Sequence, residues 1–172
     1  MPSSLMTDSM NRIEAVRDLL LGAIPEVFGT MLNTGVEPTA PDECRASEEP
    51  RVAGSVGFMG EVNGIVYLQM TASFARMLAG RLLEMPEEEF EGEEMIDDAI
   101  GEISNMVVGA VKSRLCDEGL PCVLTIPTIV RGPGFSVAAA GYSERRSIGF
   151  RCGNDRLVVD LLMKPSGESP RS

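Results

Sequence analysis

The chain has 172 residues and a formal charge of −11, so it should repel nucleic acid and anionic membrane surfaces. Its hydrophobic content of 44% is enough to build the core of one domain. It contains no histidine, which excludes Ser-His-Asp and Cys-His nucleophile systems and a phosphohistidine relay.

Two further absences set expectations for location and for metals. The sequence shows no basic segment followed by an apolar run at its start, and no apolar stretch approaches about 18 residues, so we expect a cytoplasmic protein. The cysteines form no CxxC pair and have no histidine beside them, so we expect no zinc site. Buried or incidental thiols are the simpler interpretation of Cys44, Cys116, Cys122 and Cys152.

The first predicted element after a frayed end at residues 1–7 is a helix. Apolar residues recur with a helical period over 8–31, where Asp8 or Ser9 can act as the N-cap. Pro25 should kink this helix or split it into two segments. Residues 34–50, rich in proline and acidic side chains, predict a loop with room for one short strand.

A β-hairpin and a short helix follow. Residues 51–70 contain two largely apolar segments on either side of a turn at 60–64, which predicts a β-hairpin. The pair Asn63-Gly64 is a strong hairpin signal. Thr71 or Ser73 can cap a helix over residues 72–85, which Pro86 should end. The acidic run over 87–94 then has two interpretations. It is a solvated loop whose charge favours the next helix N-terminus, or it steers the protein toward a basic partner surface.

Residues 97–115 give the strongest helix signal of the chain. At about 100° per residue, one side of this helix is apolar and predicts a core face. The opposite side carries a narrow stripe of Asp98, Glu102, Asn105 and Gly109. Asparagine and glycine are poor helix formers, costing about 0.5–1 kcal/mol each relative to alanine, so we expect them to serve something other than helix stability.

The remainder of the chain is predicted to be β-structure. Candidate strands cover residues 123–131, 135–141, 147–152 and 156–163, and short turns between them predict an antiparallel meander. The expected fold is α+β: an antiparallel sheet of about six strands, two long helices on one face and a short helix. One domain should span 8–164, with a disordered polar tail at 165–172.

The stripe offers a specific chemistry. Glu102 and Asn105 are three residues apart and therefore neighbours on a helix surface. A carboxylate can hold an ammonium group, and a carboxamide can orient a water molecule because it both donates and accepts. Gly101 lies beside the stripe and Gly109 lies on it, where missing side chains would let a partner approach closely. An exposed Glu-x-x-Asn also occurs by chance, and both glycines could equally serve packing.

The longer pattern Asp98-x3-Glu102-x2-Asn105-x21-Pro127 resembles the signature of the CheC/CheX/FliY phosphatases of bacterial chemotaxis. The order of the elements from about residue 8 to 164 is similar to that family as well. The motif appears once, because the first helix offers only Asp8-x3-Arg12-x2-Ala15 at the same spacing. A single motif is most similar to CheX, and the resemblance implies a homodimer.

The resemblance implies a phosphatase that acts on the phospho-aspartate of a CheY-like receiver domain. In that mechanism Asn105 orients the attacking water and Glu102 accepts the receiver's active-site lysine. The divalent cation, magnesium, belongs to the receiver, and no cofactor or metal is expected on this chain. Asp98 then supports Glu102 or serves as an acid favoured by the helix dipole, and Pro127 shapes the neighbouring strand.

Two other classes of function stay open at this point. The first is a non-enzymatic receiver-binding adaptor, or a flagellar-switch-type interaction module, on the same fold. The second is a signalling or structural module for another acidic or phosphorylated partner. A metalloenzyme built on Asp97, Asp98 and Glu102 is the weakest alternative, because an acidic cluster on a helix surface is usually solvated.

Overall fold

The computed structural model describes residues 9–44, 48–133 and 136–165. The expectations for the two chain ends lie outside this part, apart from Pro165. The chain forms one seven-stranded sheet with helices α1 (Ser9–Met31), α2 (Ala72–Leu83) and α3 (Glu93–Asp117). The strands are β1 (Glu37–Thr39), β2 (Arg51–Gly60), β3 (Gly64–Thr71), β4 (Cys122–Leu124), β5 (Thr128–Gly132), β6 (Glu144–Cys152) and β7 (Asp155–Met163).

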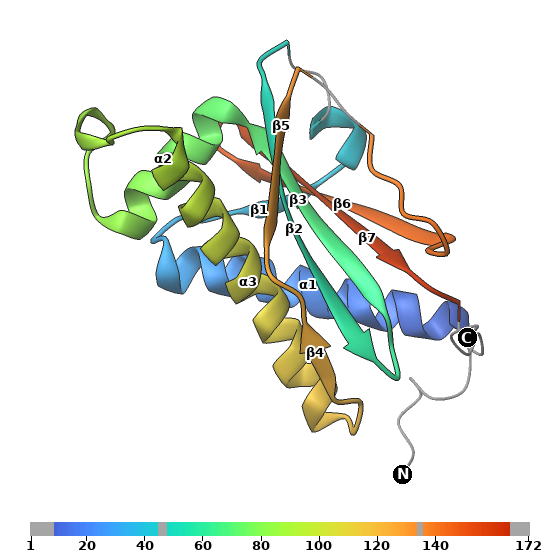
Figure 1. Cartoon of the computed structure of the whole chain (residues 1–172). Coiled ribbons are helices and arrows are strands. Elements are labelled where there is room, and N and C mark those ends of the chain that lie inside the picture. The colour runs from blue at the N-terminus through green and yellow to red at the C-terminus, as the bar shows by residue number, and fades with distance from the viewer. Residues whose placement is uncertain (1–8, 45–47, 134–135, 166–172) are drawn as a thin grey trace.

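The three helices cover one face of the sheet, as Figure 1 shows. Alternate residues of the central strands point toward them and are fully buried, among them Val66, Leu68, Val159 and Leu161. Buried residues recur every second position along the strands and about every 3.6 positions along the helices, as the sequence predicted. The expected α+β class, with two long helices and a short one on an antiparallel sheet, is confirmed.

All strand pairs are antiparallel, but the order is β1-β6-β7-β3-β2-β4, with β5 also pairing β2. The expected C-terminal meander is therefore wrong. After β5 the chain crosses from one side of the sheet to the other, and the hairpin β6–β7 pairs with β3 and β1. Because β7 is paired with β6 on one side and with β3 on the other, no further strand can pair with β7. No strand forms over residues 136–141, contrary to expectation.

Several local expectations are confirmed with adjusted ends. The hairpin of β2 and β3 has its turn at 61–63, and Thr71 caps α2 by accepting a hydrogen bond from the Phe74 amide at 3.2 Å. The helix ends before Pro86, with Glu84 in the left-handed region. The predicted loop over 34–50 holds, in its described part, the short strand β1 and a 3₁₀-helix (Pro41–Cys44).

Helix α1 runs through Pro25 as one element, so of the two expected effects, a kink or a split, the split does not occur. The proline removes one backbone hydrogen bond, but Ile24, Val27 and Phe28 around it are buried. Packing on both sides of the proline therefore outweighs the lost bond. Helix α3 begins at Glu93, four residues earlier than expected, and Glu93 and Glu94 occupy its first turn. That placement fits the favourable effect of acids at a helix N-terminus.

Candidate functional site on helix α3

Helix α3 is held tightly against the sheet. A Cβ added to Gly54 of β2 would lie 2.3 Å from the Ser104 Oγ, so glycine is required for this close approach. The buried Ser104 hydroxyl donates to the Ile100 carbonyl at 2.8 Å and is therefore satisfied within the helix. On its other buried side the helix packs against α1 and α2. Side chains on the outer face of α3 thus stand on a fixed support.

The predicted stripe lies on this outer face. Asp98 and Glu102 are exposed, while Asn105 and Gly109 are half-buried. Within the described residues, no hydrogen bond or ion pair engages the side chain of Asp98, Glu102 or Asn105. A carboxylate and a carboxamide one turn apart therefore face outward together, with their hydrogen-bonding capacity available to a partner.

Asp98 lies in the second turn of α3, because the helix starts at Glu93. The helix dipole acts mainly within the first turn, so it accounts for Glu93 and Glu94 better than for Asp98. Asp98 instead stands one turn before Glu102 on the same exposed side. The two carboxylates make this end of the stripe negative.

The structure brings Pro127 next to the stripe. Gly101 is buried, and a Cβ added there would lie 3.5 Å from the Pro127 Cβ and 4.0 Å from the Ile129 Cδ1. Gly101 thus faces the segment between β4 and β5 and serves packing in the free protein. Gly109 differs, because nothing lies within 4 Å of an added Cβ there. Of the two glycines, only Gly109 offers open space to an approaching partner.

A β-bulge places Pro127 against α3. Leu124 pairs with Phe58 and Thr128 pairs with Ser55, so three residues of one strand oppose two of β2. Thr125 stays in register, since its amide donates to the Gly57 carbonyl at 2.9 Å and the Gly57 amide donates to the Thr125 Oγ1 at 2.8 Å. Ile126 and Pro127 therefore stand opposite one residue, which is the count that defines a bulge.

The bulge reverses which residues of the strand face the helices. Before it, Leu124 lies on the helix side beside Phe58; after it, Ile129 lies on that side beside Gly54. Pro127 has no amide hydrogen to donate, so a bulge on an edge strand is a position that tolerates it. The single strand expected over 123–131 is therefore two strands, β4 and β5, and the break is next to the stripe.

Sequence reasoning missed the role of Asp97. Its Oδ1 accepts a hydrogen bond of 2.7 Å from the Arg131 Nε, which links α3 to β5. The Asp97 carboxylate is therefore already engaged by a cation of the sheet. Among the described residues no group of three metal-ligating side chains gathers at one place. The i, i+4 spacing of Asp97 and Gly101 was the available signal, because it places both on the side facing β5.

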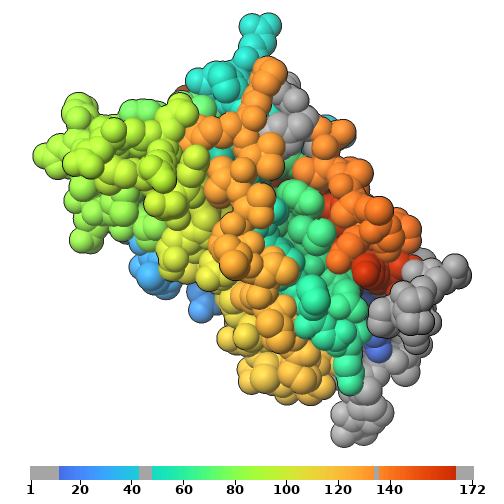
Figure 2. Space-filling model, viewed as in Figure 1, coloured from blue at the N-terminus to red at the C-terminus, as the bar shows by residue number. Residues whose placement is uncertain are grey.

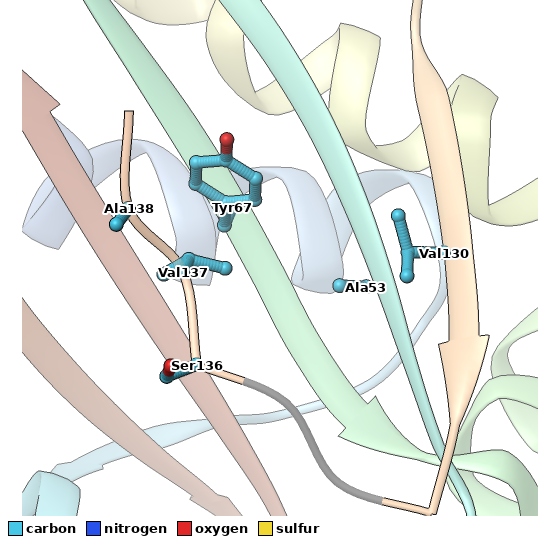
Figure 3. A pocket seen from close by; sticks show the side chains of 6 residues that line it. All are labelled: Ala53, Tyr67, Val130, Ser136, Val137 and Ala138. Atoms are coloured by element: carbon cyan, nitrogen blue, oxygen red, sulfur yellow. The ribbon is translucent and has the colours of Figure 1, made fainter. Parts of the chain in front are cut away.

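A cavity of about 200 Å³ lies elsewhere, on the face of the sheet away from the helices. Figure 3 shows Tyr67 of β3 and Val130 of β5 on either side of β2, with the segment 136–138 beside Tyr67. Its six lining residues bring no carboxylate, amide side chain or amine: Ala53, Tyr67, Val130, Ser136, Val137 and Ala138. The stripe on α3 is chemically richer and lies on the opposite side of the sheet.

The thiols offer no reactive centre near the stripe. Burial raises the pKa of the Cys122 thiol above its ordinary value, which disfavours the nucleophilic thiolate. Cys152 is half-buried, and burial raises its pKa as well. Cys116 is exposed near the end of α3, and Cys44 falls where its side chain is not described.

Helix α3 and the β4–β5 segment run side by side across one surface of the molecule (Figure 2). This surface combines the acidic and amide stripe with the bulge at 126–127. No helix of the described chain is long and apolar enough to cross a membrane. A helix-borne Glu-x-x-Asn beside Pro127, on an α+β scaffold, is consistent with the resemblance to the chemotaxis phosphatases that the sequence shows.

Comparisons with known proteins agree with that class. A family model for the chemotaxis phosphatase CheX matches residues 52–151, more than half of the chain. The chain belongs to the CheX family. No curated protein matches its sequence.

Solved structures share the fold. The chemotaxis protein CheX from Vibrio vulnificus is 20% identical, with a TM-score of 0.73 over 87% of this chain and 96% of that one. CheX in the CheX-CheY-BeF3-Mg complex from Borrelia burgdorferi is 21% identical, with a TM-score of 0.69 over 87% and 97%. FliY from Thermotoga maritima is 14% identical, with a TM-score of 0.61 over 94% and 92%.

Proposed function

We propose that this protein accelerates hydrolysis of the phospho-aspartate of a CheY-like response-regulator receiver domain. The observation that carries the proposal is the pair Glu102 and Asn105, which face outward from a rigid helix with no partner among the described residues. The complex of a Borrelia burgdorferi CheX with CheY, on the same fold, supports a receiver as the partner. Membership of a phosphatase family supports the reaction.

The chemistry needs little from this chain beyond position. An acyl phosphate is labile, and the receiver supplies a divalent cation and a lysine that neutralise phosphoryl charge. Catalysis of phosphoryl transfer is then largely a matter of placing the attacking water in line. The Asn105 carboxamide can accept from that water and orient it, but it cannot remove its proton.

Glu102 has a different task in the proposal. Its exposed carboxylate forms an ion pair with the receiver's active-site lysine and so fixes the register in which Asn105 enters. Asp98, one turn earlier, adds negative charge on the same side. Gly109 leaves open space on the outer face, and Pro127 maintains the support beneath Gly101. The homodimer stays a prediction, which light scattering on the purified protein can measure.

Separate measurements of turnover and binding test the two roles. Asn105→Ala should abolish accelerated release of phosphate from a phosphorylated receiver while leaving receiver binding close to wild type. Glu102→Ala should mainly weaken binding, because the variant loses the ion pair but retains the amide. Turnover near wild type in Asn105→Ala would show that the positioning role is wrong, and unchanged binding in Glu102→Ala would remove the docking role.

A non-enzymatic receiver-binding adaptor or flagellar-switch-type module is the second candidate. The fold also matches the middle domain of FliM from H. pylori, with a TM-score of 0.57 and 13% identity over 91% of each chain. Binding of the phosphorylated receiver without any change in its rate of phosphate loss would favour this candidate. Recovery of partners from the native cell separates both from a module for another partner, because a receiver domain should then dominate.

A further inference from the structure

The β-bulge beside the stripe presents an apolar side chain to solvent. Ile126 is 87% exposed, the largest exposed fraction among the large hydrophobic side chains that the structure describes. A single exposed apolar residue on a loop has no special meaning. Ile126 is different because it lies in a bulge between the edge strands β4 and β5, and bulges are over-represented at sheet edges and next to active sites.

Both neighbours of Ile126 are anchored. Thr125 makes two hydrogen bonds with Gly57, at 2.8 and 2.9 Å. Pro127 is half-buried, and its Cβ lies 3.5 Å from where a Gly101 side chain would begin. The apolar side chain is therefore held by fixed backbone on both sides, one residue from the contact with α3. Such a side chain loses little conformational freedom when a partner covers it.

The size of an interface connects Ile126 to the stripe. A stable complex buries about 800 Å² on each partner, a patch roughly 30 Å across. The stripe from Asp98 to Gly109 is only about 16 Å long, at 1.5 Å per residue. A receiver that places its phosphorylation site over Glu102 and Asn105 must therefore also cover a neighbouring surface. The β4–β5 segment lies directly alongside (Figure 2).

We propose that Ile126 is an apolar docking residue that contacts the receiver domain beside its phosphorylation site. The inference rests on the proposed function and adds a contact that strengthens binding without taking part in the reaction. The other exposed apolar residues of this edge are not equally placed to contact a receiver bound over α3. Val123 pairs with Met59, and Val130 pairs with Ala53, and the register places these side chains on the sheet face away from α3.

The register also supplies a matched control. Val123 is 70% exposed and only three residues from Ile126, and its pairing with Met59 places its side chain on the sheet face away from α3. The experiment measures the affinity of Ile126→Ser, Ile126→Leu and Val123→Ser for a CheY-like receiver from the same genome, loaded with beryllofluoride and magnesium. Turnover of the phosphorylated receiver at saturating concentration is measured in parallel.

We expect Ile126→Ser to bind about tenfold more weakly, because the variant loses most of one buried aliphatic side chain. Its turnover at saturation should equal that of wild type, and Ile126→Leu and Val123→Ser should bind as wild type does. Affinity of Ile126→Ser within twofold of wild type overturns the inference, as does an equal loss in Val123→Ser.

The two proposals fail in different ways. Unchanged affinity of Ile126→Ser alongside an inactive Asn105→Ala removes only the docking residue. Full turnover in Asn105→Ala, with weaker binding by Ile126→Ser, removes the water-positioning role and leaves the docking residue. A wild-type protein that does not bind the loaded receiver overturns both.

Discussion

The two long helices α1 and α3 cover the same face of the sheet, but they use their exposed side chains differently. They have similar lengths, 23 and 25 residues, and both carry carboxylates and glycines on the outside. In α1, the residue three positions after Glu14 is Arg17, and the residue three positions after Glu26 is Gly29, so neither glutamate has an asparagine at that spacing. Helix α3 has Asn105 at that distance from Glu102.

Both glutamates of α1 are already engaged, while its third carboxylate, Asp18, is exposed. Glu14 pairs with Arg17 at 2.8 Å and with Arg146 at 2.5 Å, and Glu26 pairs with Arg114 of α3 at 3.7 Å. Glu102 and Asn105 have no such partner among the described residues. Equal helices in the same layer thus differ in their roles. Both helices contribute ion pairs within the chain, but α3 also keeps a carboxylate and an amide available side by side.

The largest expected effect is the loss of turnover when the Asn105 amide is changed. Asn105→Asp keeps the size of the side chain but replaces a group that donates and accepts with one that only accepts and repels phosphoryl oxygens. Turnover of a phosphorylated receiver should fall by about 100-fold or more, because a misplaced water is enough to cost that much. Receiver turnover by stopped-flow fluorescence checks it, and activity within threefold of wild type would contradict it.

The next largest effect concerns the support under α3. Gly54→Ala should lower the free energy of unfolding by about 1–3 kcal/mol, because the new methyl group meets the Ser104 Oγ at 2.3 Å. The double variant Gly54→Ala/Ser104→Ala removes that oxygen and should recover part of the loss. Urea denaturation measures both. A single variant as stable as wild type would mean that the close approach of α3 and β2 is not required.

Two open glycines give a matched pair between the helices. Neither Gly22 of α1 nor Gly109 of α3 has any atom within 4 Å of an added Cβ. Changing either to Gln should raise the free energy of unfolding by about 0.5 kcal/mol through helix propensity. Only Gly109→Gln should weaken binding of the loaded receiver, by about fivefold, because only that glycine lies on the docking stripe. Equal binding by the two variants would remove the partner-approach role of Gly109.

The smallest effect is a pH dependence on α1. Hydrogen bonding to the Arg146 guanidinium, against some burial, lowers the pKa of Glu14 below its ordinary 4.5. A lowered pKa means that Glu14 stabilises the fold above pH 4.5 and that this contribution disappears as the pH falls through the folded value. Glu14→Gln should cost less than about 1 kcal/mol at pH 7. The difference from wild type should shrink below pH 4.5 in thermal unfolding, and a constant difference would argue against the ion pair.

The helices, the hairpin and the stripe could be predicted because their signals are local. Apolar residues at helical spacing placed α1 and α3, and Asn63-Gly64 marked the turn between β2 and β3. The resemblance in the pattern from Asp98 to Pro127 led to the family to which the chain belongs. These features depend on residues close together or on spacing that the sequence itself displays.

The missed features depend on which strands become neighbours. The segment 136–141 has a strand-like sequence, but the chain crosses the sheet there from β5 to β6, and the segment pairs with no strand. The bulge arises from a register shift between β4 and β5 along β2, and neither register can be read from one strand alone. The bond between Asp97 and Arg131 follows from that same register.

The rate of phosphate loss from a receiver in a single turnover tests the water-positioning role most directly. A pre-phosphorylated CheY-like receiver is mixed with an excess of this protein, and the first-order loss of its phosphoryl group is followed with and without magnesium. Wild type should raise the rate well above that of the receiver alone. Asn105→Ala should bind the receiver but leave the receiver's intrinsic rate of phosphate loss unchanged. Equal acceleration by wild type and Asn105→Ala, or none by wild type despite binding, would contradict the proposal.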